Sequence, residues 1–147
     1  MFSGGCLCGA VRFEVAEIVG PFELCHCPRC RRSTGSAFAA MVGAKLEGFR
    51  ITQGSESMRS IELPVLETPP GYRRSFCGLC GSLLPDPNPL WNWFEVPAGC
   101  LDDDPGVRPD KHINVERKAA WHDIVDGLPQ YTKAQLRAHR AARDEGA

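Results

Sequence analysis

The chain has no hydrophobic run long enough to cross a membrane and no large excess of charge of either sign. Its longest apolar stretches are interrupted by charges, glycine or proline well before the ~18 residues that a membrane-spanning helix needs. The net charge is -1, so nothing indicates a strongly basic or acidic surface for nucleic acid or membranes. The first residues also lack the basic start and apolar run of an export signal. We therefore expect a cytoplasmic protein with no nucleic-acid or membrane partner.

The sequence predicts a mainly β fold with a short C-terminal helix. Fifteen glycines and 12 prolines separate short segments that alternate in polarity or are rich in β-branched residues. These segments are residues 9–15, 49–52, 59–63, 93–96 and 112–116. Residues 132–147 are rich in helix formers, and Thr132 with Gln135 has the form of a capping box. We expect the arginines of this helix to be solvated and Trp121, before it, to lie in the core.

Eight cysteines are the most informative residues of the chain. Seven occur in tight groups, and Cys100 alone has no cysteine neighbour; the groups are Cys6 and Cys8, then Cys25, Cys27 and Cys30, then Cys77 and Cys80. Cytosolic thiols are kept reduced, which disfavours disulfides. Closely spaced thiolates can converge on one zinc ion at about 2.3 Å. We therefore expect zinc sites, and an inert thiol at Cys100.

Seven grouped thiols divide into four and three. Four thiolates complete a tetrahedral zinc site, whereas three leave a position that water or a substrate can take. Residues at i and i+2 of an extended segment face the same side, so Cys25 and Cys27 can bind one metal while His26 faces away. Spacing leaves open whether the pair Cys6 and Cys8 or the pair Cys27 and Cys30 completes the four-thiolate site with residues 77 and 80.

Several motifs carry a family resemblance that covers Gly4 to about Tyr131. They are "GGCLCGAVRFEV", "CHCPRCRRSTGSAFAAMV", "SFCGLCGSLL", "GCLDD" and "HINVERKAAWHDIVDGLP", in that order. The chain resembles the glutathione-dependent formaldehyde-activating enzyme family, whose domain also occurs in centromere protein V. The resemblance implies an Mss4-like zinc-binding β-sheet fold, and we expect this domain at residues 1–131 and the C-terminal helix and tail at residues 132–147. It also implies two zinc ions per chain. The ligands of the structural zinc are Cys6, Cys8, Cys77 and Cys80. The ligands of the second zinc, which keeps an open position, are Cys25, Cys27 and Cys30.

The resemblance further implies a carbon-sulfur lyase, similar to S-hydroxymethylglutathione synthase, acting on a glutathione adduct of formaldehyde or a related aldehyde. A fourth thiolate would raise the negative charge of the open site, and nearby arginines would offset it. We expect Arg31 and Arg32 to bind substrate, because arginine binds the carboxylates of such a peptide bidentately. The proton donor stays open among His112, Ser33, Thr34 and a water. The alternative function is a non-catalytic thiol-binding or interaction module.

Overall fold

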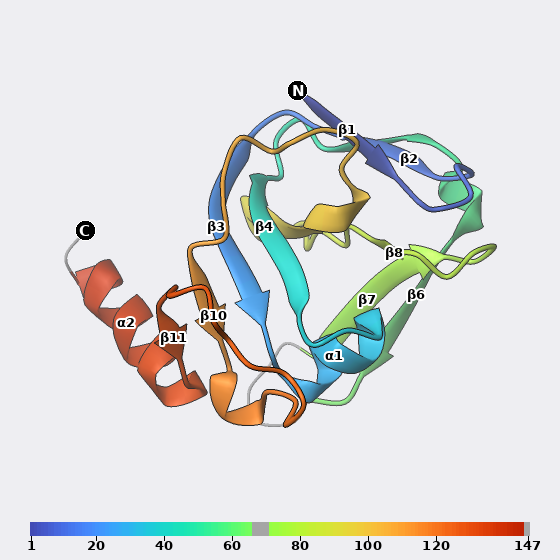
Figure 1. Cartoon of the computed structure of the whole chain (residues 1–147). Coiled ribbons are helices and arrows are strands. Elements are labelled where there is room, and N and C mark those ends of the chain that lie inside the picture. Colours follow the sequence, from blue (N-terminus) through green and yellow to red (C-terminus); the bar gives the residue numbers. More distant parts are fainter. Residues whose placement is uncertain (66–70, 146–147) are drawn as a thin grey trace. The chain divides into compact units, whose positions relative to one another are not determined.

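The computed structural model describes residues 1–65 and 71–145. It confirms the mainly β fold with a C-terminal helix (Figure 1). The strands are β1 Phe2–Gly5, β2 Arg12–Val15, β3 Ile18–Cys25, β4 Ala39–Lys45, β5 Arg50–Gln53, β6 Met58–Leu63, β7 Tyr72–Cys77, β8 Leu83–Leu84, β9 Trp93–Pro97, β10 Lys111–Ile113 and β11 Gln130–Tyr131. The helices are α1 Pro28–Thr34 and α2 Lys133–Glu145, with 3-10 turns at Ser55–Ser57, Ala98–Cys100 and Val115–Arg117.

The chain forms two compact units. The first contains Met1–Gly20 and Val42–Val107, and the second contains Pro21–Met41 and Arg108–Ala147. The chain crosses between the two units three times, within strand β3, within strand β4 and after Val107. Residues 146 and 147, at the end of the expected C-terminal tail, lie outside the described residues.

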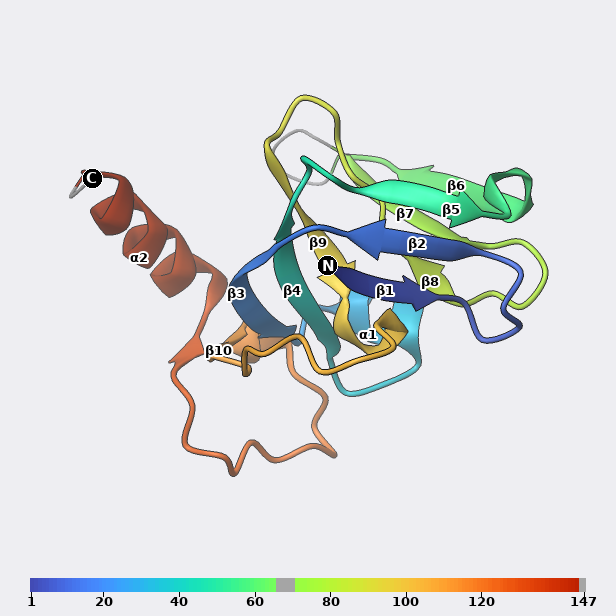
Figure 2. The same cartoon turned by 90° about the horizontal axis from the view of Figure 1, so that it is seen from above.

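The first unit contains two three-stranded sheets, with strand orders β1-β2-β5 and β6-β7-β8. Neighbouring strands in both sheets are antiparallel, and Figure 2 shows β1, β2 and β5 side by side. The alternation predicted for residues 9–15 holds, because Val11, Phe13 and Val15 are fully buried. The ring of Phe49 packs edge-on against Phe94, with ring centroids 4.8 Å apart.

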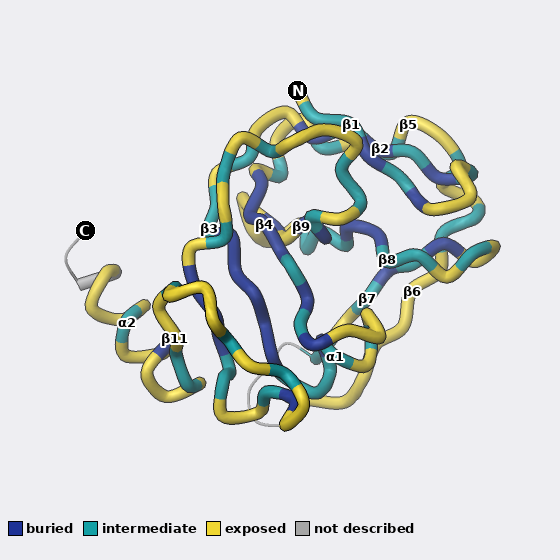
Figure 3. The backbone as a smooth tube through the Cα atoms, viewed as in Figure 1, coloured by how far each residue is buried: buried dark blue, intermediate teal, exposed yellow. Residues whose placement is uncertain are grey.

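The second unit carries β11, β10, β3 and the start of β4 as consecutive neighbours in a sheet. Strand β10 runs parallel to both β3 and β11, and Ile113 pairs with Cys25 in this register. Figure 3 shows that β3 becomes buried toward its C-terminal end, where residues Phe22–Cys25 are all buried. The register therefore brings a thiol at the end of β3 beside the end of β10.

Helix α2 begins as the sequence predicts. The Thr132 N–H donates to the Gln135 side chain at 2.9 Å, and the Gln135 N–H donates to the Thr132 hydroxyl at 3.2 Å. Leu136 of this helix is buried. The prediction for Trp121 is wrong, since 74% of this residue is exposed. It lies in a turn between β10 and β11, where no strand pairing holds it against a core.

A buried carboxylate anchors α2 to the sheet of the second unit. The Arg140 guanidinium donates to both oxygens of Glu23, at 3.1 and 2.9 Å, and the Lys111 ammonium lies 3.6 Å away. Replacing Arg140 by alanine removes these charge-assisted bonds while Lys111 still faces Glu23. We expect Arg140→Ala to lower the free energy of unfolding by about 1–2 kcal/mol in a denaturant titration. Arg143→Ala, on an exposed side of the same helix, is the control; equal losses would contradict this role for Arg140.

Candidate metal centres

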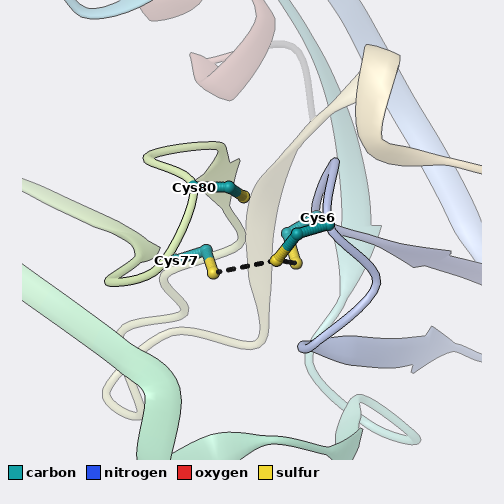
Figure 4. Close-up of side chains that lie close together, drawn as sticks. Cys6, Cys77 and Cys80 are labelled. Atoms are coloured by element: carbon teal, nitrogen blue, oxygen red, sulfur yellow. Dashed lines mark hydrogen bonds between the residues drawn. The ribbon is translucent and has the colours of Figure 1, made fainter.

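The four-thiol group lies in the first unit, at the ends of two antiparallel hairpins. Cys6 and Cys8 belong to the turn that joins β1 to β2, whereas Cys77 ends β7 and Cys80 lies in the following turn. Figure 4 shows Cys6 and the pair Cys77 and Cys80 with their sulfurs directed toward one another. All four Sγ atoms lie within 4.8 Å of one another. The structure thus groups Cys77 and Cys80 with Cys6 and Cys8 rather than with Cys27 and Cys30.

The distances within this group fit a tetrahedral metal. The Sγ atoms of Cys6 and Cys8 are 3.6 Å apart, and those of Cys8 and Cys77 are 3.9 Å apart. Four sulfurs at about 2.3 Å from a zinc ion would be about 3.8 Å from one another. The donor set is also the one that structural zinc prefers.

Backbone turns hold the four thiols in place. The Cys6 carbonyl accepts from the Gly9 N–H, and the Cys77 carbonyl accepts from the Gly81 N–H at 2.8 Å. Gly9 and Gly81 have φ of 75° and 77°, a left-handed conformation that glycine adopts at no steric cost. Hydrogen bonding with Ser82 lowers the pKa of Cys80 to about 5, which favours the thiolate that a metal binds. The Ser82 hydroxyl also accepts from the Leu7 N–H at 3.0 Å and so joins the two turns.

The three-thiol group lies in the second unit, where β3 meets α1. Cys25 is the last residue of β3, Cys27 is the N-cap of α1, and Cys30 lies in the first turn of that helix. Pro28 at the helix start has the fixed φ that a first turn needs. The three Sγ atoms lie within 4.8 Å of one another, and no other His, Cys, Asp or Glu among the side chains that the structure describes, in residues 1–65 and 71–143, joins them. The sequence did not predict α1.

Hydrogen bonds distribute the charge among these three thiols unequally. Hydrogen bonds with the Cys25 and Cys30 thiols, together with hydrogen bonds from backbone N–H groups, lower the pKa of Cys27 to about 2. The Cys30 N–H donates to the Cys27 sulfur at 3.3 Å. Hydrogen bonds with the Cys27 and Cys30 thiols raise the pKa of Cys25. Cys27 therefore ionises more readily than Cys25, and all three thiols are close enough to share one metal.

Asn114 supports this group, and the sequence analysis did not single it out. Its side-chain amide donates to the Cys25 sulfur at 3.2 Å. Its φ of 56° is the one positive value at a non-glycine residue in the described part of the chain. Asparagine tolerates this conformation better than most residues. In the motif "HINVERKAAWHDI", strand β10 ends at Ile113 and the chain turns at Asn114. The motif does not show that the Asn114 amide reaches Cys25, because that contact depends on the register of β10 with β3.

His26 is not part of the three-thiol group, as expected. Its ring is fully buried, with its Nε2 atom 2.8 Å from Nδ1 of His112. The ring centroids of Phe38 and His122 are 5.4 and 5.8 Å from that of His26. Burial lowers the pKa of His26 to about 4, and the neighbouring positive charges, including that of Arg31, contribute in the same direction. His26 is therefore neutral at pH 7.

The residues expected to handle substrate lie on or beside α1. Arg31 is half-buried, and its Nε atom is buried without a hydrogen-bond partner among the described residues. Arg32 is exposed, so its guanidinium is accessible. The Ser33 and Thr34 hydroxyls donate to the Cys30 carbonyl at 3.0 and 2.9 Å, within the helix. His112 is the third side chain among the candidate proton donors. Its two ring nitrogens each lie 2.8 Å from another ionisable group, His26 on one side and Asp126 on the other.

Cys100 is separate from both thiol groups. Its thiol donates to the Leu83 carbonyl at 2.9 Å. Burial raises its pKa to about 11, so the reactive thiolate is scarce at neutral pH. These features agree with the inert thiol that the sequence predicts.

Among the described residues, no helix is long and apolar enough to cross a membrane.

Comparison with known proteins identifies the family of the chain. The family model of the glutathione-dependent formaldehyde-activating enzyme matches residues 1–117. A protein of Halomonas elongata, provisionally named as such an enzyme, is 33% identical over 129 residues, in an alignment that covers 84% of this chain and 81% of the relative. The crystal structure of a Rhodobacter sphaeroides protein is similar in fold, with a TM-score of 0.53 and 24% identity over 88% of this chain and 99% of that one. On the family model and the curated relative, the chain belongs to the glutathione-dependent formaldehyde-activating enzyme family.

Proposed function

We propose that this protein is a zinc-dependent carbon-sulfur lyase, or in reverse a synthase, acting on the adduct of glutathione or a similar thiol with formaldehyde or a related aldehyde. The observation that carries the proposal is the difference between the two groups: one has four thiols, the other has three and no fourth protein ligand among the described residues. A tetrahedral metal held by three thiolates keeps one position for a substrate. Family membership supplies the substrate class.

The two groups have different roles in this proposal. Cys6, Cys8, Cys77 and Cys80 hold a structural zinc, and Cys25, Cys27 and Cys30 hold the second zinc. When bound there, zinc lowers the pKa of a substrate thiol and stabilises the thiolate at neutral pH. The terminal nitrogens of Arg31 and the guanidinium of Arg32 bind the carboxylates of the peptide. We also propose a cytoplasmic location, because a reducing compartment keeps all seven thiols available for metal.

The reaction balances without a redox step. In the lyase direction the carbon-sulfur bond of the S-hydroxymethyl adduct breaks, and its electron pair goes to the sulfur. The hydroxyl proton leaves, and the carbon-oxygen bond becomes the carbonyl of the aldehyde. In the synthase direction the sulfur attacks the aldehyde carbon and the oxygen gains a proton. The protein must therefore accept or donate one proton at the oxygen, and stabilise a thiolate at the sulfur.

The first test is the amount of zinc per chain, measured by elemental analysis of protein purified without chelators. We expect about two ions per chain, because two separate groups of thiols have the spacing that zinc requires. The same preparation should accelerate cleavage of the adduct above its uncatalysed rate. A zinc content of one ion per chain that does not increase when zinc is added would contradict the second site. Two ions with no acceleration would instead favour the alternative, a non-catalytic thiol-binding or interaction module.

A further inference from the structure

One residue beside the three-thiol group adopts a backbone conformation that costs it free energy. Asn114 directly follows strand β10 and has a φ of 56°. The other eight described residues with positive φ are all glycine, for which this conformation has no steric cost. A glycine at position 114 would therefore suit the backbone better, so the asparagine side chain must contribute something that glycine lacks.

The side chain of Asn114 is directed at a candidate metal ligand. Its amide nitrogen donates to the Cys25 sulfur at 3.2 Å. The register of β10 with β3 produces this contact, because Ile113 pairs with Cys25 and the Ile113 carbonyl accepts from the His26 N–H at 3.0 Å. The left-handed turn comes directly after this pair and places the amide beside the sulfur that ends β3.

Asparagine is the residue type that meets both demands of this position. Glycine, asparagine and aspartate adopt a left-handed backbone most readily. Of these three, only asparagine has an N–H donor in its side chain, because glycine has no side chain and an ionised aspartate only accepts. A carboxylate would also repel a sulfur that carries negative charge. The residue type at position 114 therefore favours a hydrogen bond to Cys25 as the use of this turn.

This hydrogen bond becomes stronger when Cys25 binds a metal. A neutral thiol is a weak acceptor, whereas hydrogen bonds to an ionised acceptor are roughly twice as strong as neutral ones. A cysteine that binds metal does so as a thiolate. The Asn114 amide therefore stabilises the metal-bound form of the three-thiol group more than the metal-free form. The Cys30 N–H, which donates to the Cys27 sulfur at 3.3 Å, acts in the same way on a second thiolate.

Hydrogen bonds to the ligand sulfurs matter most in a site that accepts a further anion. Zinc with three thiolates has a net charge of about -1, and a fourth thiolate changes it to about -2. An N–H donor lowers the energy of this added charge, because it withdraws electron density from a ligand sulfur. Removing the donor should therefore weaken the binding of a fourth thiolate as well as that of the metal.

We propose that Asn114 stabilises Cys25 as a metal-bound thiolate, and is thus a positioning residue for the metal of the three-thiol group and for a thiolate that joins this metal as fourth ligand. The role toward the metal does not depend on the enzyme assignment. Only the identification of the fourth thiolate with a glutathione-like substrate rests on the proposed function.

The first test is the zinc affinity of Asn114→Gly, measured by competition with a chelator in the full chain. Glycine keeps the left-handed turn and removes the amide, so a role in the turn alone predicts no change. We expect one of the two zinc ions to bind about 10–100-fold more weakly, the usual cost of losing a group that hydrogen-bonds to a metal ligand. Asn92→Gly, the same change at an exposed residue of the first unit, should alter neither affinity. Unchanged binding of both ions by Asn114→Gly would overturn the proposal.

A second measurement needs no variant. Cadmium-113 replaces zinc in thiolate sites, and an N–H group that donates to a metal-bound sulfur couples to it through the hydrogen bond. We expect a proton–cadmium NMR correlation between the Asn114 amide and one cadmium ion, with the amide identified by nitrogen-15 in the three asparagines of the chain. The Val11 N–H, which donates to the Cys6 sulfur at 3.3 Å, should correlate with the other ion. A spectrum that shows the Val11 correlation and lacks that of Asn114 would overturn the proposal.

Glutathione and S-methylglutathione separate the two roles of Asn114. Both are titrated into zinc-saturated protein, and only glutathione has a thiol that can become the fourth ligand. We expect glutathione to bind Asn114→Gly about 2–10-fold more weakly than the wild type, the effect of one hydrogen bond, and S-methylglutathione to bind both proteins equally. Equal binding of glutathione to both proteins would overturn the role toward the fourth thiolate. Because binding is read without turnover, a protein that fails to cleave the adduct can still bear out or overturn either role.

Discussion

Cys80→Ser should abolish the folded state of the protein under conditions where the wild type is stable. Structural zinc sites contribute an apparent binding free energy of about 10–16 kcal/mol at pH 7, whereas whole domains have a stability of about 5–15 kcal/mol. We expect the group of Cys6, Cys8, Cys77 and Cys80 to lose its zinc together with one of its four thiolates, which removes an amount comparable to the entire stability. The group also joins the β1–β2 turn to the turn after β7. The measurements are a thermal melt and the zinc content of the variant.

Cys100→Ser is the matched control for this substitution. It makes the same chemical change at a thiol outside both groups, and serine can keep the bond to the Leu83 carbonyl. We expect its melting temperature to stay close to that of the wild type and its zinc content to stay at about two per chain. A Cys80→Ser protein that melts at the temperature of Cys100→Ser would show that the four-thiol group does not hold the fold together.

Cys27→Ser should leave a folded protein that holds about one zinc and has lost its ability to cleave the adduct. Cys27 is at the start of α1, in the second unit, and hydrogen bonds with neighbouring thiols lower the pKa of its own thiol. Changing residues that only orient metal ligands costs 10–100-fold in metal affinity or activity, so loss of a ligand should cost more than about 100-fold. The measurements are the rate of adduct cleavage against the uncatalysed rate, the zinc content and the thermal melt.

The contrast between the two variants tests the division of roles. If Cys27→Ser and Cys80→Ser were equally unfolded, both metals would be structural. If Cys27→Ser cleaved the adduct as fast as the wild type, the three-thiol group would not be the reaction site, and the thiol-binding or interaction module would be the better account. Cys100→Ser again provides the control, with both zinc content and rate expected to be unchanged.

Local features of the sequence predicted much of the fold. Alternating polarity identified β2, and the Thr132 and Gln135 side chains marked the start of α2, because these signals come from residues within a few positions of one another. The same local reasoning failed for Trp121, whose burial depends on whether its segment pairs with a sheet. It also missed α1, a helix of seven residues whose start coincides with metal-type spacing.

The types and the close spacing of the thiols are visible along the chain, and they are enough to predict two metal groups. Which groups combine depends on the tertiary fold. Cys8 meets Cys77 from 69 positions away, the Asn114 amide reaches Cys25 across 89, and His26 meets His112 across 86. Pairings over such separations depend on how strands are ordered and in what register they lie, since a shift of one residue turns every side chain to the other face. The spacing of cysteines along the chain therefore shows which neighbouring thiols can bind one metal, whereas the order and register of the strands determine which distant side chains join them.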